Sequence, residues 1–162
     1  MVDPLLWWTV RRLRSRDWPT RARAVERLGR FSNPRAKRPL FTALADEFPL
    51  VRQAAAQALG RFSGPDVIEA LRIALRDDCF VVVQAAACAL NQSGFEPADP
   101  DDTAGILVGQ GKWDDVASFG ASAIPRLLPA LRDKNAPDIC GGAARALRGI
   151  RGERAVTYFV AM

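Results

Sequence analysis

The chain of 162 residues contains no histidine, only three cysteines and only two methionines. Without histidine, a Ser-His-Asp or Cys-His nucleophile pair cannot form, and the commonest metal ligand and usual proton shuttle are missing. The cysteines, Cys79, Cys88 and Cys140, form no Cys-x-x-Cys pair, which is typical of reduced thiols in a cytosolic protein. These absences disfavour an enzyme, and we expect no bound metal or cofactor.

Long hydrophobic segments are also absent from the sequence. The most apolar stretch, residues 79–90, includes Gln84 and is too short to span a bilayer. The first residues lack the charged and apolar regions of a secretory signal peptide. We therefore expect a cytoplasmic protein without a membrane partner.

Positive charge is concentrated in the first 62 residues, which hold 13 Lys and Arg against 5 Asp and Glu. The remaining residues hold 10 against 13, so one part of the chain accounts for the net charge of +5. Nearly all the cations are arginine, which binds carboxylates and phosphates through paired hydrogen bonds. Three interpretations stay open, in order of preference: a solvated face, a site for an acidic protein segment, and a nucleic-acid site with steep salt dependence.

Internal repetition is the strongest pattern in the sequence. Three segments, residues 18–34, 49–65 and 80–90, align without a gap at a period of 31 residues. The alignment superposes leucines, glycines, phenylalanines and prolines, among them Leu28, Leu59 and Leu90. A period of this length indicates stacked units, each burying its apolar face against the next.

Each period contains two helical patterns, with apolar residues spaced three and four apart and with proline or glycine at the ends. We expect helix pairs over residues 4–16 and 19–30, 34–47 and 49–62, 65–77 and 80–92, and 123–133 and 141–150. The repeats then cover residues 4–33, 34–64, 65–94 and 123–150 of a single domain, 1–162. Residues 95–122 are expected to form an irregular insert with short helices at 101–109 and 113–119, and residues 151–162 a partial repeat or cap.

Two further groups of residues receive structural interpretations. Of the adjacent Trp7 and Trp8, at most one is expected to face the core, while the other caps the array or contacts a partner. Asp114 and Asp115 fit no EF-hand loop, and a place in the first turn of a helix explains them.

The repeats resemble short HEAT-like repeats of the bacterial type. The residues that carry the resemblance are Leu40, Leu44, Asp46, Val51, Arg52, Ala55, Ala58, Leu59 and Gly60, and the pattern returns over residues 71–90 and, more weakly, 127–147. The resemblance implies an all-α fold, a right-handed α-solenoid of about four to five stacked antiparallel helix pairs. It also implies a polar ladder of Asp and Arg between repeats. Val83 and Ser15 stand where an Arg and an Asp would be, so we expect an interrupted ladder.

The resemblance further implies that the second helix of each pair lines the concave surface. Periodicity selects the outward-facing residues of these helices as the predicted partner-binding site: Arg23, Glu26, Arg27, Arg30, Gln53, Gln57, Arg61, Gln84, Cys88, Gln92, Arg145 and Arg148. We expect a non-enzymatic scaffold that binds a protein there, with its oligomeric state left open. Two other classes remain: a subunit like the HEAT-like bilin lyases and isomerases, and a nucleic-acid-binding protein related to the HEAT-like glycosylases of alkylated DNA bases.

Overall fold

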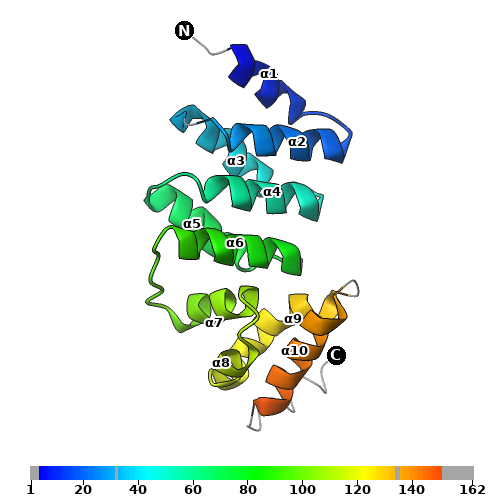
Figure 1. Ribbon diagram of the computed structural model, residues 1–162, viewed down its shortest axis with the longest axis vertical. Coiled ribbons are helices and arrows are strands. Elements are labelled where there is room, and N and C mark those ends of the chain that lie inside the picture. The colour runs from blue at the N-terminus through cyan, green and yellow to red at the C-terminus, as the bar shows by residue number, and fades with distance from the viewer. Residues whose placement is uncertain (1–3, 32, 134–135, 151–162) are drawn as a thin grey trace.

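The computed structural model describes residues 4–31, 33–133 and 136–150, and this part of the chain contains α-helices, two short 3-10 helices and no strand. The α-helices are α1 (Pro4–Arg12), α2 (Trp18–Leu28), α3 (Lys37–Ala43), α4 (Pro49–Leu59), α5 (Pro65–Ala74), α6 (Phe80–Gln92), α7 (Pro100–Gly109), α8 (Trp113–Ala117), α9 (Ile124–Arg132) and α10 (Pro137–Gly149). The 3-10 helices η1 (Pro34–Ala36) and η2 (Gly120–Ala123) precede α3 and α9. The helices stack into an elongated array, with α1 at one end and α10 near the other (Figure 1). The predicted all-α solenoid is confirmed, and the expected partial repeat at 151–162 lies outside the described residues.

Side-chain caps and prolines set the helix starts. The carboxylate of Asp17 accepts a hydrogen bond of 3.1 Å from the backbone N–H of Thr20, and Pro19 stands in the first turn of α2. Most of the expected helices end a few residues earlier than predicted, because the last residues form single turns. After α2, for example, the backbone N–H of Phe31 donates to the carbonyl of Leu28 at 3.1 Å. α10 starts four residues before the predicted position because Pro137 opens its first turn.

The second helices of the first three repeats, α2, α4 and α6, lie one above another in front of α3 and α5 (Figure 1). α2 and α4 touch at Gly29, where an added Cβ would lie 2.7 Å from the Cβ of Ala58. α4 and α6 touch at Gly60, where it would lie 2.9 Å from the Cβ of Ala89. Glycine is therefore needed at both positions, and these equivalent contacts keep the three helices in register.

The hydrophobic core consists of two clusters that meet at α6. The first runs from α1 to α7 and includes Leu28, Leu59 and Leu90. The second joins α6 to α7, α8, α9 and α10, and α6 contributes Phe80 and Val83 to it. α6 therefore connects the regular repeats to the rest of the array.

The segment over residues 95–122 contains two helices that pack into the array. α7 packs against α6, and α8 packs against α10. Beyond α7 the direction of the helices changes: α10 runs steeply, whereas α2, α4 and α6 run across the array (Figure 1). The side chains at the end of α7 thereby come next to those of α6.

Candidate functional site

A ladder of ion pairs runs along the edge of the array where the two helices of each repeat meet. The guanidinium of Arg21 donates to both carboxylate oxygens of Asp46 at 2.7 and 2.8 Å, and Arg52 binds Asp77 at the same two distances. Each pair joins an arginine to an aspartate 25 residues later, in the following repeat. Ser15 therefore does not interrupt this edge ladder as expected, because it need only supply its backbone carbonyl, 2.9 Å from Nη1 of Arg21.

Burial and pairing together set the pKa values along the edge ladder. Burial by itself would raise the pKa of Asp46, but hydrogen bonds from Arg21 and from the backbone N–H of Phe48 outweigh it, so the pKa lies below its usual value. The pKa values of Arg21 and Arg52 are raised, mainly by hydrogen bonds to their aspartate partners. The edge ladder is thus fully ionised at neutral pH, and its side chains are engaged in holding repeats together.

The edge ladder ends at α6, where Val83 replaces arginine as expected. The residue 25 positions later is Val108, and both valines are buried in the second core cluster. A pair of apolar residues thus stands where the third ion pair would be. Such a replacement is energetically acceptable, because removing two charges from water costs about as much as their attraction returns.

A second group of ion pairs holds the first turn of α7. Arg72 of α5 binds Asp102, while Arg76 of α5 and Arg126 of α9 both bind Asp101. The hydrogen bond from Arg126 is the main reason why the pKa of Asp101 is lowered, and the bond from Arg76 acts in the same direction against burial. This group ties α7 to helices on both sides of it.

A groove runs across the exposed face of α2, α4 and α6. Its largest hollow, about 910 Å³, is lined by α4, α6 and the end of α7. Two smaller hollows, of about 210 and 440 Å³, continue it between α2 and α4. The smallest side chains in the lining are Gly29, Ala54, Ala58, Ala85, Ala89 and Gly109.

Eight of the twelve predicted site residues line these hollows: Glu26, Arg30, Gln53, Gln57, Arg61, Gln84, Cys88 and Gln92. They form three rows, each repeating every 31 residues across the helices. The row at the helix ends, which we call the arginine row, is Arg30, Arg61 and Gln92. The middle row is Glu26, Gln57 and Cys88, and the third is Ala22, Gln53 and Gln84.

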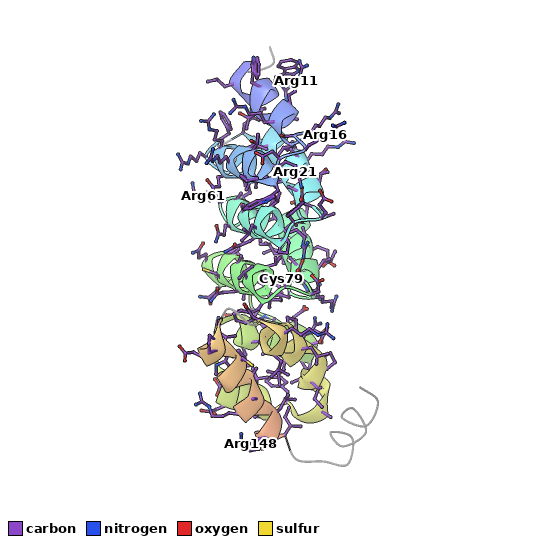
Figure 2. All side chains as sticks on the ribbon, turned by 90° about the vertical axis from the view of Figure 1, so that its right-hand side faces the viewer. Arg11, Arg16, Arg21, Arg61, Cys79 and Arg148 are labelled. Carbon is purple, nitrogen blue, oxygen red and sulfur yellow. The ribbon has the colours of Figure 1, made fainter. Side chains whose placement is uncertain are left out.

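The other four predicted residues, Arg23, Arg27, Arg145 and Arg148, do not line the three hollows. The residues of α4 equivalent to Arg23 and Arg27 are alanines, one of which packs on Gly29 of the preceding helix. No helix of the same layer precedes α2 in the described part of the chain, so Arg23 and Arg27 are exposed at the end of the stack. Arg145 and Arg148 belong to α10, and Arg148 lies at the far end of the array from α1 (Figure 2).

Three polar residues that the sequence reasoning missed also line the largest hollow: Asn91, Gln110 and Lys112. They follow or end α6 and α7, and the usable signal was the polar run Gln110–Lys112 directly after the apolar α7. With them the lining is cationic near α2 and α4, rich in amides over α4 and α6, and cationic again at Lys112. Within the described hollows, Glu26 is the one carboxylate of the lining.

The arginines of the N-terminal half do not share one face. Figure 2 shows Arg61 at one side of the array and Arg16 at the other, with Arg21 of the edge ladder between them. Only some of the positive charge therefore belongs to the groove.

α1 carries a separate exposed cluster. Trp7 and Trp8 are 51% and 60% exposed, with their rings edge to face at 6.1 Å, and Arg11 lies over Trp7. Neither tryptophan faces the core; Leu6 and Thr9 do so instead.

In the described ranges no three His, Cys, Asp or Glu side chains come together as a metal site. Nor does any helix there have the length and apolar character needed to cross a membrane.

Stacked helix pairs, a repeating contact between neighbouring helices and a groove along one layer define an α-solenoid repeat protein. A family model described as HEAT repeats matches residues 5–91, more than half of the chain. The chain belongs to the HEAT repeat family, and HEAT repeats are in general protein-interaction scaffolds. The match covers α1 to α6, and so includes the edge ladder and most of the groove. No curated protein matches the chain.

Proposed function

We propose that the protein is a non-enzymatic scaffold that holds an extended segment of a partner protein in the groove across α2, α4, α6 and the end of α7. The observation that carries this proposal is the composition of the largest hollow. Its lining combines six side-chain amides with two cations, and its remaining members are alanine, glycine and one cysteine.

Side-chain amides suit a polypeptide backbone. Each Gln or Asn side chain offers both a donor and an acceptor, and an extended segment presents unpaired N–H and C=O groups along its length. The alanines and glycine of the floor leave room for a backbone to approach the helices. A hollow for a small ligand would instead be mostly apolar, with a few convergent polar groups.

The groove also offers no constellation for a reaction. The thiol of Cys88 accepts a hydrogen bond from the amide of Gln92 at 3.4 Å, and no acid or base contacts it in the described structure. An activated cysteine needs such a base or a lowered pKa. The polar groups are therefore suited to binding.

The experiment is a selection from a displayed library of random 12-residue peptides, followed by fluorescence polarisation with the selected peptides. The double variant Gln57→Leu/Gln84→Leu removes two amides from the middle of the groove. We expect it to bind the peptides about tenfold more weakly, since each hydrogen bond contributes about 1 kcal/mol. Thr42→Leu, an exposed polar residue on α3 in the other layer, is the matched control and should bind as the parent does.

Equal binding by the double variant, or failure to select any peptide, would contradict the proposal. The two other function classes make different predictions. A bilin-handling subunit would change the visible spectrum of biliverdin on mixing, and a nucleic-acid binder would bind duplex DNA with steep salt dependence. Either result, if it required the groove residues, would replace the scaffold.

A further inference from the structure

We infer that the partner segment is acidic and adopts a polyproline II conformation, with two carboxylates three residues apart bound by Arg30 and Arg61. The inference rests on the proposed function and specifies the chemistry of the partner. It comes from three features of the arginine row: its spacing, its free charges and the neighbours of those charges.

The spacing of the arginine row fits a segment that crosses the helices. Arg30 and Arg61 occupy equivalent positions on the adjacent helices α2 and α4, and both line the two smaller hollows. Packed helices lie about 8–10 Å apart. A polyproline II segment rises about 3.1 Å per residue with three residues per turn, so its residues i and i+3 point the same way at about 9 Å.

The same conformation fits the amide-lined part of the groove. A polyproline II segment has no internal backbone hydrogen bonds, so its N–H and C=O groups are free to bind side-chain amides. The third member of the arginine row is Gln92, which offers an amide without charge. The groove would therefore take an acidic residue, a second acidic residue three positions on, and then a neutral polar residue.

The charges of Arg30 and Arg61 are free to bind such a segment. Both side chains are exposed, and neither has an ion pair with any residue that the structure describes. By contrast, Arg21 and Arg52 on the same helices are saturated by carboxylates. A free guanidinium binds a carboxylate in a paired geometry with strong hydrogen bonds.

The neighbours of the arginine row favour a carboxylate segment over nucleic acid. Glu26 lines the smaller hollow beside Arg30 and would repel a continuous run of phosphates. The cationic part of the row also ends after two helices, at Gln92. Nucleic-acid affinity depends on many phosphate contacts, which two arginines do not supply.

The test uses fluorescein-labelled, proline-rich 12-residue peptides that carry two glutamates at a separation of two, three or four residues, and a version with glutamine at both positions. We expect the separation of three to bind at least fivefold more tightly than the others. Arg30→Gln and Arg61→Gln should each weaken that peptide about tenfold. Arg38→Gln, an exposed arginine on α3 in the other layer, should leave binding unchanged. Circular dichroism of each variant verifies that the fold is intact.

Several results would overturn the inference. If the glutamine peptide binds as tightly as the best glutamate peptide and still requires Gln57 and Gln84, the partner is not acidic, while the proposed function stands. If no peptide of the series binds, the inference fails, and the library selection, which demands no charge, decides separately whether the proposed function fails. A 20-base-pair DNA duplex that binds more tightly than the glutamate peptides through Arg30 and Arg61 would also exclude it.

Discussion

The helices α2 and α4 present arginine in two contrasting ways. Near their first turns, Arg21 and Arg52 are fixed by aspartates and backbone carbonyls as parts of the edge ladder. At their ends, Arg30 and Arg61 are exposed in the groove without an ion pair in the described structure. Both sets follow the same period, so periodicity alone does not separate a structural arginine from a binding one.

The difference between the two sets lies in the residue 25 positions later. For the edge ladder this residue is an aspartate, which the next repeat brings against the guanidinium. For the arginine row it is an alanine buried in the core. The comparison teaches that an arginine in this array is structural where the next repeat supplies its counter-ion, and is available to a partner where it does not.

The largest effect should come from placing an arginine at the edge-ladder position of α6, which has no aspartate partner. Val83→Arg would bury a guanidinium in the second core cluster, where the parent side chain is 1% exposed. We expect the free energy of unfolding to fall by about 3 kcal/mol or more, because an unpaired buried charge is strongly destabilising. Urea denaturation followed by circular dichroism measures it.

A second substitution tests whether the partner position is the reason. Adding Val108→Asp supplies a carboxylate 25 residues later, and the double variant should recover part of the loss, as double-mutant cycles detect. A double variant no more stable than Val83→Arg would break the rule drawn from the comparison.

Next in size is the loss of an existing ladder pair. Arg52→Ala leaves the carboxylate of Asp77, whose side chain is 12% exposed, without its guanidinium. We expect unfolding to become easier by about 2–3 kcal/mol, since a largely buried charge loses its partner. Thermal and urea denaturation measure the change, and a loss below about 0.5 kcal/mol would place this pair among the weak surface ion pairs.

A smaller effect concerns acid. The pKa values of Asp46 and Asp101 are lower in the folded protein than the ordinary value of about 3.9. A lowered pKa stabilises the folded state above the unfolded-state value, and this stabilisation is lost as the pH falls through the folded-state value. The free energy of unfolding should therefore decline below about pH 4. In Asp46→Asn the decline should be shallower, as urea titrations from pH 7 to pH 2.5 would show; an unchanged slope would exclude Asp46 as a contributor.

The smallest expected effect on stability is that of a groove arginine. Arg61→Ala removes an exposed side chain without an ion pair in the described structure, so the free energy of unfolding should stay within about 0.5 kcal/mol of the parent. Set beside Arg52→Ala on the same helix, this gives the cleanest contrast between the two arginine sets. A loss as large as that of Arg52→Ala would mean that Arg61 is structural after all.

Much of the array could be predicted from sequence because the 31-residue period places apolar residues and prolines at equivalent points. The helix over residues 80–92 agrees with α6 to the residue. Several other helix ends were misplaced because a last turn such as that of Phe31 on Leu28 is a local choice that the apolar pattern does not encode. The partner of Arg21 was also out of reach, since the pairing joins two repeats and depends on how they stack.

The groove was partly predictable for the same reason. Outward positions such as Gln57 and Gln84 follow from helical spacing within a repeat. The exposed end position of Arg23 depends on what precedes α2 in the stack, and the inclusion of Lys112 depends on how α7 packs on α6. Both are properties of the assembled array, which a pattern within one repeat does not contain.

One consequence of the shared helix concerns the entropy of binding. Eight of the thirteen residues of α6 are buried, compared with four of eleven in α2, because α6 has a core cluster on each side. A helix clamped in this way has little freedom to shift, so the amides of Gln84 and Gln92 are held on a rigid base. The middle of the groove is thus preorganised, and a bound segment there loses less of its interaction energy to ordering the protein than it would at the α2 end.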